Sequence, residues 1–176
     1  MQIILISFKM SCERCSKTMP TLPPGSTWGP PLWILLHGLA DRSDVIVKPH
    51  TLAYAARQWI RLLDALPMSL PCPICQTHAT DWIKVHPVQP LLKVTSLKEW
   101  LVDWLYTFHE AVNVIRGAPS FDKTLLHETY KDVNLKTIFE STKDVITKAK
   151  EIGGTGFLQW KQWVGMMHML LTIHGV

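Results

Sequence analysis

Apolar residues recur at intervals of three and four positions along four stretches of the chain, which is the spacing of helices with one buried face. The predicted helices cover residues 31–42, 51–66, 72–85 and 97–116. The clearest boundary is the start of the fourth helix, where Ser96 is followed three residues later by Glu99 and predicts a capping box. Gly117 marks the end of this helix. Two further helices are predicted at residues 133–150 and 157–173.

The short connections between these helices, and the lack of the alternating pattern typical of strands, predict an all-α fold. An antiparallel four-helix bundle with additional C-terminal helices is the simplest arrangement. Residues 16–27 are rich in Pro, Ser and Thr and predict a linker. The expected parts of the chain are therefore a flexible N-terminal arm at 1–25, a main domain at 26–122 and a helical extension at 123–176.

Composition excludes several classes of protein. Of the 176 residues, 47% are apolar and eight are Trp, which is too hydrophobic for a disordered chain. The net charge of +4 comes from dispersed Lys and Arg without a nucleic-acid-binding motif, so nucleic-acid binding is not expected. The first residues lack the pattern of a secretory signal, which predicts a cytoplasmic protein. The last apolar stretch is short for a membrane span and contains Lys161 and Gln162, which favours a core or docking helix.

The four cysteines form two Cys-x-x-Cys pairs, Cys12/Cys15 in the arm and Cys72/Cys75 at a predicted helix start. A helix N-terminus stabilises a thiolate through its dipole and its free N–H groups, so the second pair suits redox chemistry. The alternative is a zinc site that uses all four thiolates. The separation of the pairs by more than fifty residues is unusual for such a site, and no metal is expected.

Two further pairs of residues share a helix face at a spacing of four, Trp33 with His37 and His109 with Asn113. Taken alone, such pairs are more typical of a packed core than of a ligand site. Their order along the chain, however, resembles that of the Erv/ALR family of sulfhydryl oxidases. The resemblance rests on Trp28-Gly29-x3-Trp33-x3-His37, then Pro71-Cys72-x2-Cys75, then His109-x2-Val112-Asn113-x3-Gly117-x-Pro119-x-Phe121-Asp122.

The resemblance covers residues 26–122 and implies a four-helix bundle that binds FAD. It implies that Cys72 and Cys75 are catalytic: they take electrons from the thiols of protein substrates and pass them through the flavin to O2, which gives H2O2. It also implies a homodimer, and for Cys12 and Cys15 a role as a shuttle that delivers electrons to the core pair. The residues that it places around FAD are Gly29, Trp33, His37, His109, Val112, Asn113, Arg116 and Phe121.

The chain departs from the family pattern at three points. Glu110 stands where the family usually has Asn, Ala118 stands where it usually has Lys, and the family's downstream structural cysteine pair is absent. Sparse cysteine use is similar to that of compact virus-encoded members, which implies a location in the host cytoplasm or the virion. Two alternative functions stay open at this point: a zinc-stabilised helical interaction module, and a structural virion protein without catalytic activity.

Overall fold

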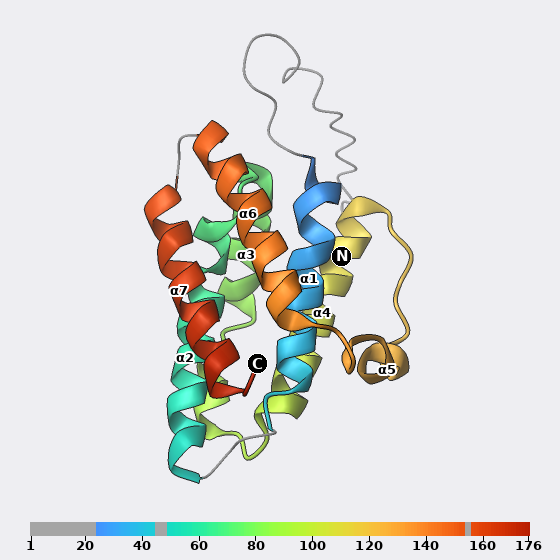
Figure 1. The fold of residues 1–176 in the computed structure, drawn as a ribbon. Coiled ribbons are helices and arrows are strands. Elements are labelled where there is room, and N and C mark those ends of the chain that lie inside the picture. The colour runs from blue at the N-terminus through green and yellow to red at the C-terminus, as the bar shows by residue number, and fades with distance from the viewer. Residues whose placement is uncertain (1–23, 45–48, 154–155) are drawn as a thin grey trace.

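The computed structural model describes residues 24–44, 49–153 and 156–176 (Figure 1). These ranges contain helices and no strand, so the all-α prediction is confirmed. The α-helices are α1 (Gly25–Asp41), α2 (Pro49–Ser69), α3 (Pro73–Val85), α4 (Leu97–Arg116), α5 (Leu126–Tyr130), α6 (Leu135–Gly153) and α7 (Phe157–Ile173). Two short 3-10 helices, η2 (Gln89–Lys93) and η3 (Lys123–Leu125), lie in the connections.

Every predicted helix is present, and the largest shift of a boundary is at α1. This helix begins at Gly25 rather than at Pro31, and Pro30 and Pro31 lie inside it. Each proline removes the hydrogen bond to the carbonyl four residues before it and crowds that carbonyl, and burial of Trp28, which is 6% exposed, offsets this cost by holding the earlier turn against the bundle. The five-residue helix α5 was not predicted, because so short a segment contains no apolar repeat.

The six long helices surround one hydrophobic core. Helix α1 packs against α4 and α6, α2 packs against α3 and α7, and α6 packs against α7. The C-terminal pair α6 and α7 therefore lies alongside α1 and α2 (Figure 1). Each of these six helices contributes fully buried side chains to the core: Leu35, Leu39, Trp59, Leu63, Ala79, Leu101, Leu105, Ile146, Trp160 and Trp163.

The contacts between α3 and α4 bring the start of α3 to the end of α4. Trp82 stacks on Phe108 with ring centroids 5.6 Å apart, and the indole N–H of Trp104 donates to the backbone carbonyl of His86 at 3.0 Å. Later residues of α3 thus meet earlier residues of α4, so the two helices are antiparallel. Cys72, just before α3, consequently lies at the C-terminal end of α4.

The start of α4 combines a local cap with a contact from elsewhere in the chain. The hydroxyl oxygen of Ser96 accepts from the backbone N–H of Glu99 at 3.1 Å, as the capping box predicts. The carboxylate at this helix start comes from Asp44, which accepts from the backbone N–H groups of Leu97 and Lys98 at 2.9 and 3.1 Å. Gly117 ends the helix in the left-handed region, with φ of 65°.

None of the described helices is both long and apolar enough to cross a membrane. Helix α7 buries Trp160, Trp163 and Met167 in the shared core. This packing agrees with the prediction of a core helix for the last apolar stretch.

Candidate functional site

The Cys72/Cys75 pair lies at the N-terminus of α3, with both side chains half-buried. Cys72 is the N-cap residue in an extended conformation, and its sulfur accepts from the backbone N–H of Cys75 at 3.3 Å. Pro73 occupies the first helical position, where its missing N–H donor and fixed φ suit a helix start. The sequence therefore builds the dithiol locally.

The two thiols of this pair have opposite acidities. Hydrogen bonds from the Cys75 thiol and from the backbone N–H groups of Cys75 and Ile74 lower the pKa of Cys72 to about 6, against the opposing effect of burial. The hydrogen bond to Cys72, together with burial, raises the pKa of Cys75. In the reduced protein near neutral pH, Cys72 is therefore the thiolate and Cys75 the thiol. This asymmetry makes Cys72 the nucleophile of the pair.

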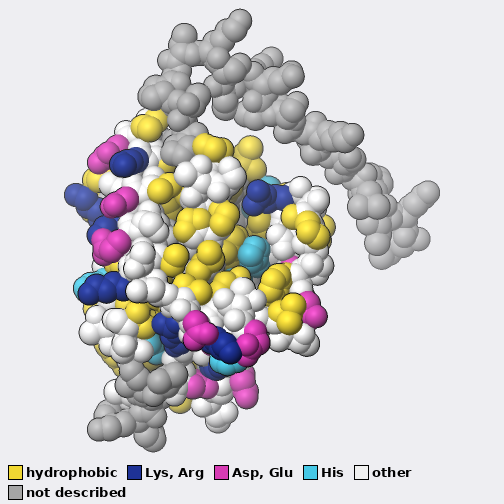
Figure 2. All heavy atoms as spheres, turned by 45° about the vertical axis from the view of Figure 1, so that its right-hand side comes forward, with side chains coloured by type: hydrophobic (Ala, Val, Ile, Leu, Met, Phe, Trp, Pro, Cys, Tyr) yellow, Lys and Arg dark blue, Asp and Glu magenta, His cyan; other side chains and the backbone are white. Residues whose placement is uncertain are grey.

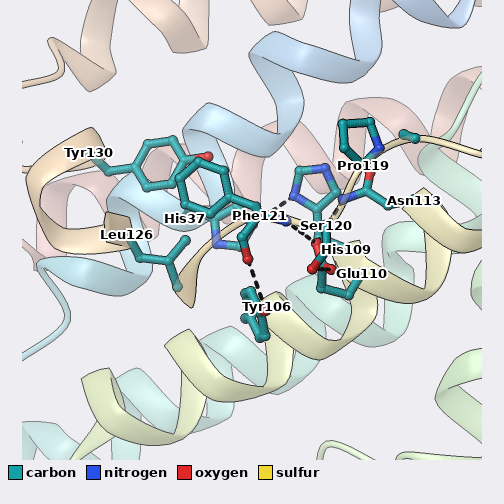
Figure 3. A pocket seen from close by; sticks show the side chains of 11 residues that line it. His37, Tyr106, His109, Glu110, Asn113, Pro119, Ser120, Phe121, Leu126 and Tyr130 are labelled. Carbon is teal, nitrogen blue, oxygen red and sulfur yellow. Dashed lines mark hydrogen bonds between the residues drawn. The ribbon is translucent and has the colours of Figure 1, made fainter. Parts of the chain in front are cut away.

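A cavity of about 300 Å³ lies between α1, α4, α5 and the loop that follows α4 (Figure 3). On the side of the molecule where α5 lies, hydrophobic side chains gather at the surface with a histidine beside them (Figure 2). The cavity is lined by His37, Tyr106, His109, Glu110, Asn113, Ala118, Pro119, Ser120, Phe121, Leu126 and Tyr130.

Aromatic side chains form one wall of the cavity, and further aromatic side chains stack on that wall. The rings of Trp33 and His109 are stacked 4.0 Å apart at 8°. His37 Nε2 and His109 Nδ1 share a hydrogen bond of 3.1 Å, and the His37 ring stacks on Tyr130 with centroids 5.2 Å apart. Asn113 lies one turn after His109 on α4 and lines the same cavity.

Both imidazoles in this wall are neutral near pH 7. Burial, together with the neighbouring His109, lowers the pKa of His37 to about 3. Burial also lowers the pKa of His109 to about 4. The Nδ1 atom of His37 is buried and has no hydrogen-bond partner among the described residues. The wall thus offers uncharged ring faces and one polar atom without a partner.

Glu110, one of the departures from the family pattern, fixes the loop above the cavity. Its carboxylate accepts from the amide of Asn113 at 2.8 Å, from the backbone N–H of Phe121 at 3.2 Å and from the hydroxyl of Ser120 (Figure 3). These hydrogen bonds, led by that from Ser120, lower the pKa of Glu110. The carboxylate therefore orients Asn113 and holds the loop, a role that sequence reasoning missed.

Arg116 connects the dithiol with the cavity electrostatically. Its charge opposes the hydrogen bond and the burial that raise the pKa of Cys75, and it adds to the effect of burial on His109. Because α3 runs antiparallel to α4, the dithiol lies at the C-terminal end of α4, the end at which Asn113 and residues 118–121 line the cavity. The side chain of Arg116 is exposed at the last position of α4.

The structure brings half of the eight predicted cofactor residues directly to the cavity: His37, His109, Asn113 and Phe121. Trp33 adjoins them through its stack on His109. Val112 is half-buried and packs against the core, and Gly29 is buried in α1 with open space where a side chain would begin. Cys12 and Cys15 lie outside the described residues.

Two tyrosines of the cavity, Tyr106 and Tyr130, were not among the predicted residues. Tyr106 precedes His109 by three positions and Asn113 by seven, so a search for a helical stripe would have found it. Its hydroxyl donates to the carbonyl of Phe121 at 3.0 Å. Tyr130 belongs to α5, and no sequence pattern indicated that this segment returns to α1.

In the part of the chain that the structure describes, no three His, Cys, Asp or Glu side chains converge in a way that could hold a metal ion. The zinc alternative requires Cys12 and Cys15, which lie outside this part. The described residues therefore contain at most half of such a site.

Comparison with known proteins identifies relatives of this chain. Residues 30–131 match the sequence profile of the Erv1 / Alr family. Protein 347L of Invertebrate iridescent virus 6, named an FAD-linked sulfhydryl oxidase, is 27% identical over 106 residues, which cover 59% of this chain and 92% of that protein. Protein 096R of Invertebrate iridescent virus 3, with the same name, is 26% identical over 104 residues, 59% of this chain and 66% of that protein.

A third similarity is of a different kind. Mitochondrial citrate synthase of Emericella nidulans aligns at 25% identity over 175 residues, 94% of this chain but only 35% of that enzyme. Most of that enzyme therefore has no counterpart here. No solved structure matches this chain significantly. The dithiol and every residue that lines the cavity lie within the part that matches the family profile.

Proposed function

The chain belongs to the Erv1/Alr family of FAD-linked sulfhydryl oxidases, and on this premise we propose that Cys72 and Cys75 form disulfides in protein substrates while O2 is reduced to H2O2. The observation that carries the proposal is the position of a dithiol with an acidic first cysteine at the same end of the bundle as an aromatic cavity. Thiol oxidation requires a reactive thiolate and a redox cofactor that takes up the electrons.

The residues of the cavity fit FAD. The ring faces of Trp33, His37 and His109 suit stacking on an aromatic ring system, and the buried Nδ1 of His37 lacks a partner that a ligand would supply. Asn113 offers an amide, and the exposed guanidinium of Arg116 suits the pyrophosphate. A volume of about 300 Å³ is at the lower end for ligand sites, so the cavity would enclose one ring system rather than the whole dinucleotide.

The proposed thiol chemistry balances within the chain and its substrate. A substrate thiolate attacks the sulfur of Cys72 in the Cys72–Cys75 disulfide, the disulfide bond breaks, and Cys75 leaves and takes up a proton. A second substrate thiolate then attacks the substrate sulfur of the mixed disulfide and releases Cys72. The hydrogen bonds that lower the pKa of Cys72 stabilise this released thiolate, so they favour the reduced form of the pair and make its disulfide oxidising. FAD, held by His37, His109 and Asn113, would supply the acceptor for the two electrons that leave the reduced pair when its disulfide forms again, with O2 as the final oxidant.

Oxidation of a simple dithiol by the purified full-length protein tests the proposal. We expect a yellow protein that releases FAD on denaturation, consumes O2 and forms one H2O2 for each disulfide. Tightly bound zinc without flavin would instead support the interaction module. Bound FAD without dithiol oxidation would support a structural protein, and either result would remove the oxidase from consideration.

We further propose that Cys12 and Cys15 are a shuttle pair in the N-terminal arm. Helix α1 is antiparallel to α4, because Asp41 at its end forms an ion pair with Lys98 at the start of α4, whereas the earlier Trp33 stacks on the later His109. Its first residue, Gly25, consequently lies at the dithiol end of the bundle. Cys15 precedes Gly25 by ten positions, a segment that reaches at most about 35 Å when extended. A tether of this length gives an effective concentration in the millimolar range, on the order of 1 mM.

Replacing Cys12 and Cys15 together by Ser is expected to change the oxidation rate of a folded protein substrate but not that of a small dithiol. Oxidation of dithiothreitol should remain within about twofold of the unchanged protein, because a small dithiol reaches Cys72 directly. Oxidation of a reduced, folded protein substrate should fall by roughly tenfold or more, because the tethered pair no longer collects its electrons. Oxygen uptake with each substrate measures both rates, and an equal loss with both would indicate a structural role for the arm.

A further inference from the structure

A buried amine lies outside the cavity and the dithiol. Lys150, on α6, is 2% exposed, and its Nζ donates to the backbone carbonyl of Met68 at 3.0 Å. No carboxylate among the described residues forms an ion pair with it. Burial lowers the pKa of Lys150. Since removing an amine from water is unfavourable, a contact of this kind needs a structural reason.

Gly156, the residue just before α7, lies against this contact. Gly156 has φ of +67°, a conformation that favours glycine. A Cβ at this position would lie 2.9 Å from Lys150 Nζ and 3.0 Å from the Met68 oxygen. Both the backbone conformation and the lack of a side chain at Gly156 thus accommodate the pair.

The carbonyl that Lys150 binds belongs to the turn that leads to the dithiol. Met68 lies in the last turn of α2, where carbonyl groups lack helical partners and the helix dipole attracts a positive charge. Two residues later, the carbonyl of Leu70 accepts from the side-chain amide of Gln76 on α3 at 2.7 Å. The turn is therefore held by Lys150 at one end and by Gln76 at the other, and Cys72 follows directly.

We propose that Lys150 is a positioning residue for the dithiol: by holding the Met68 carbonyl, it fixes the turn that places the Cys72 sulfur against the N–H groups at the start of α3. The amine acts through the backbone and touches no reacting atom. Lys150 and Gly156 both lie beyond residues 30–131, the part that matches the family profile. The inference thus assigns a task to the C-terminal helices, and it rests on the proposed function for its importance to catalysis.

The acidity of Cys72 in the reduced protein tests this proposal. The pH dependence of alkylation by iodoacetamide, read at Cys72 by peptide mass spectrometry, should give a pKa of about 6 in the unchanged protein. In Lys150→Met, the value should rise by about one unit, the shift expected when a thiolate loses one of its hydrogen bonds. Lys148→Met is the matched control, because Lys148 is an exposed lysine on the same helix, and it should leave the value unchanged.

Gly156→Ala is the second variant and decides the outcome if Lys150→Met does not fold. It keeps the amine but crowds its contact with Met68, so it should shift the Cys72 value in the same direction. An unchanged Cys72 value in the folded variants, with only a lower melting temperature, would overturn the proposal and leave Lys150 a purely structural residue. The measurement needs neither FAD nor turnover. A protein without oxidase activity that still shows the shift would refute the proposed function and support the inference.

Discussion

Replacing either Cys72 or Cys75 by Ser is expected to reduce dithiol oxidation by on the order of 1,000-fold or more, because neither variant can form the internal disulfide. Both variants should retain FAD, since the dithiol is separate from the residues that line the cavity. Oxygen uptake with dithiothreitol measures the loss, and the visible spectrum measures the retained cofactor. Full activity in either variant would remove the pair from the mechanism.

The same two variants should differ in reactivity toward an aromatic disulfide at pH 6. In Cys75→Ser, Cys72 keeps the backbone N–H groups that stabilise its thiolate and should form a mixed disulfide readily. In Cys72→Ser, burial continues to raise the pKa of Cys75 and should slow the reaction. The difference should be about tenfold, because the larger thiolate fraction of the more acidic cysteine is partly offset by its lower nucleophilicity.

Mass spectrometry of the trapped adduct identifies the reacting cysteine. We expect the adduct at Cys72 in Cys75→Ser and little adduct at Cys75 in Cys72→Ser. Faster trapping in Cys72→Ser would reverse the assigned roles, because it would make Cys75 the cysteine that meets the substrate.

Replacing Trp33 by Ala is expected to weaken FAD binding by roughly 5- to 150-fold, the loss of about 1–3 kcal/mol that accompanies removal of an aromatic stacking surface. Trp33 is half-buried and stacks on His109, which lines the cavity. Flavin content after extended dialysis measures the change. His37→Ala and Asn113→Ala should act in the same direction, because each removes a ring face or an amide from the cavity.

Trp100→Ala provides the matched control for Trp33→Ala. Trp100 is also half-buried and stacks on another aromatic ring, that of Trp104 at 6.2 Å, but it does not line the cavity. It should lower the melting temperature without lowering the flavin content. Equal flavin loss in both variants would mean that the bundle as a whole had loosened, and unchanged flavin content in Trp33→Ala would contradict the assigned site.

Much of the candidate site could be predicted because its parts are local. Helical periodicity placed Trp33 above His37 and His109 above Asn113, since residues four apart share one face of a helix. Pro73 and the spacing of Cys72 and Cys75 defined a helix start at the dithiol. The resemblance to the family then indicated that these separate parts belong to one site.

The contacts between distant segments could not be predicted from these patterns. Asp44 accepts from the backbone N–H groups of Leu97 and Lys98 at the start of α4, a contact from another segment that the capping-box pattern did not indicate. Tyr130 reaches His37 from a segment without an apolar repeat. Glu110 was noted as a departure from the family, and only the folded loop shows it binding Asn113 and Phe121.

The sequence by itself therefore determined the helices and the dithiol at a helix start, because hydrophobic spacing, proline geometry and capping act over a few residues. The resemblance to the family indicated most of the aromatic residues of the cavity. Only the tertiary structure decided which helices pack together, how far burial lowers the pKa of His37, and that Lys150 reaches the turn before Cys72. These properties depend on desolvation and on contacts between residues far apart in the chain, which exist only once the shared core has formed.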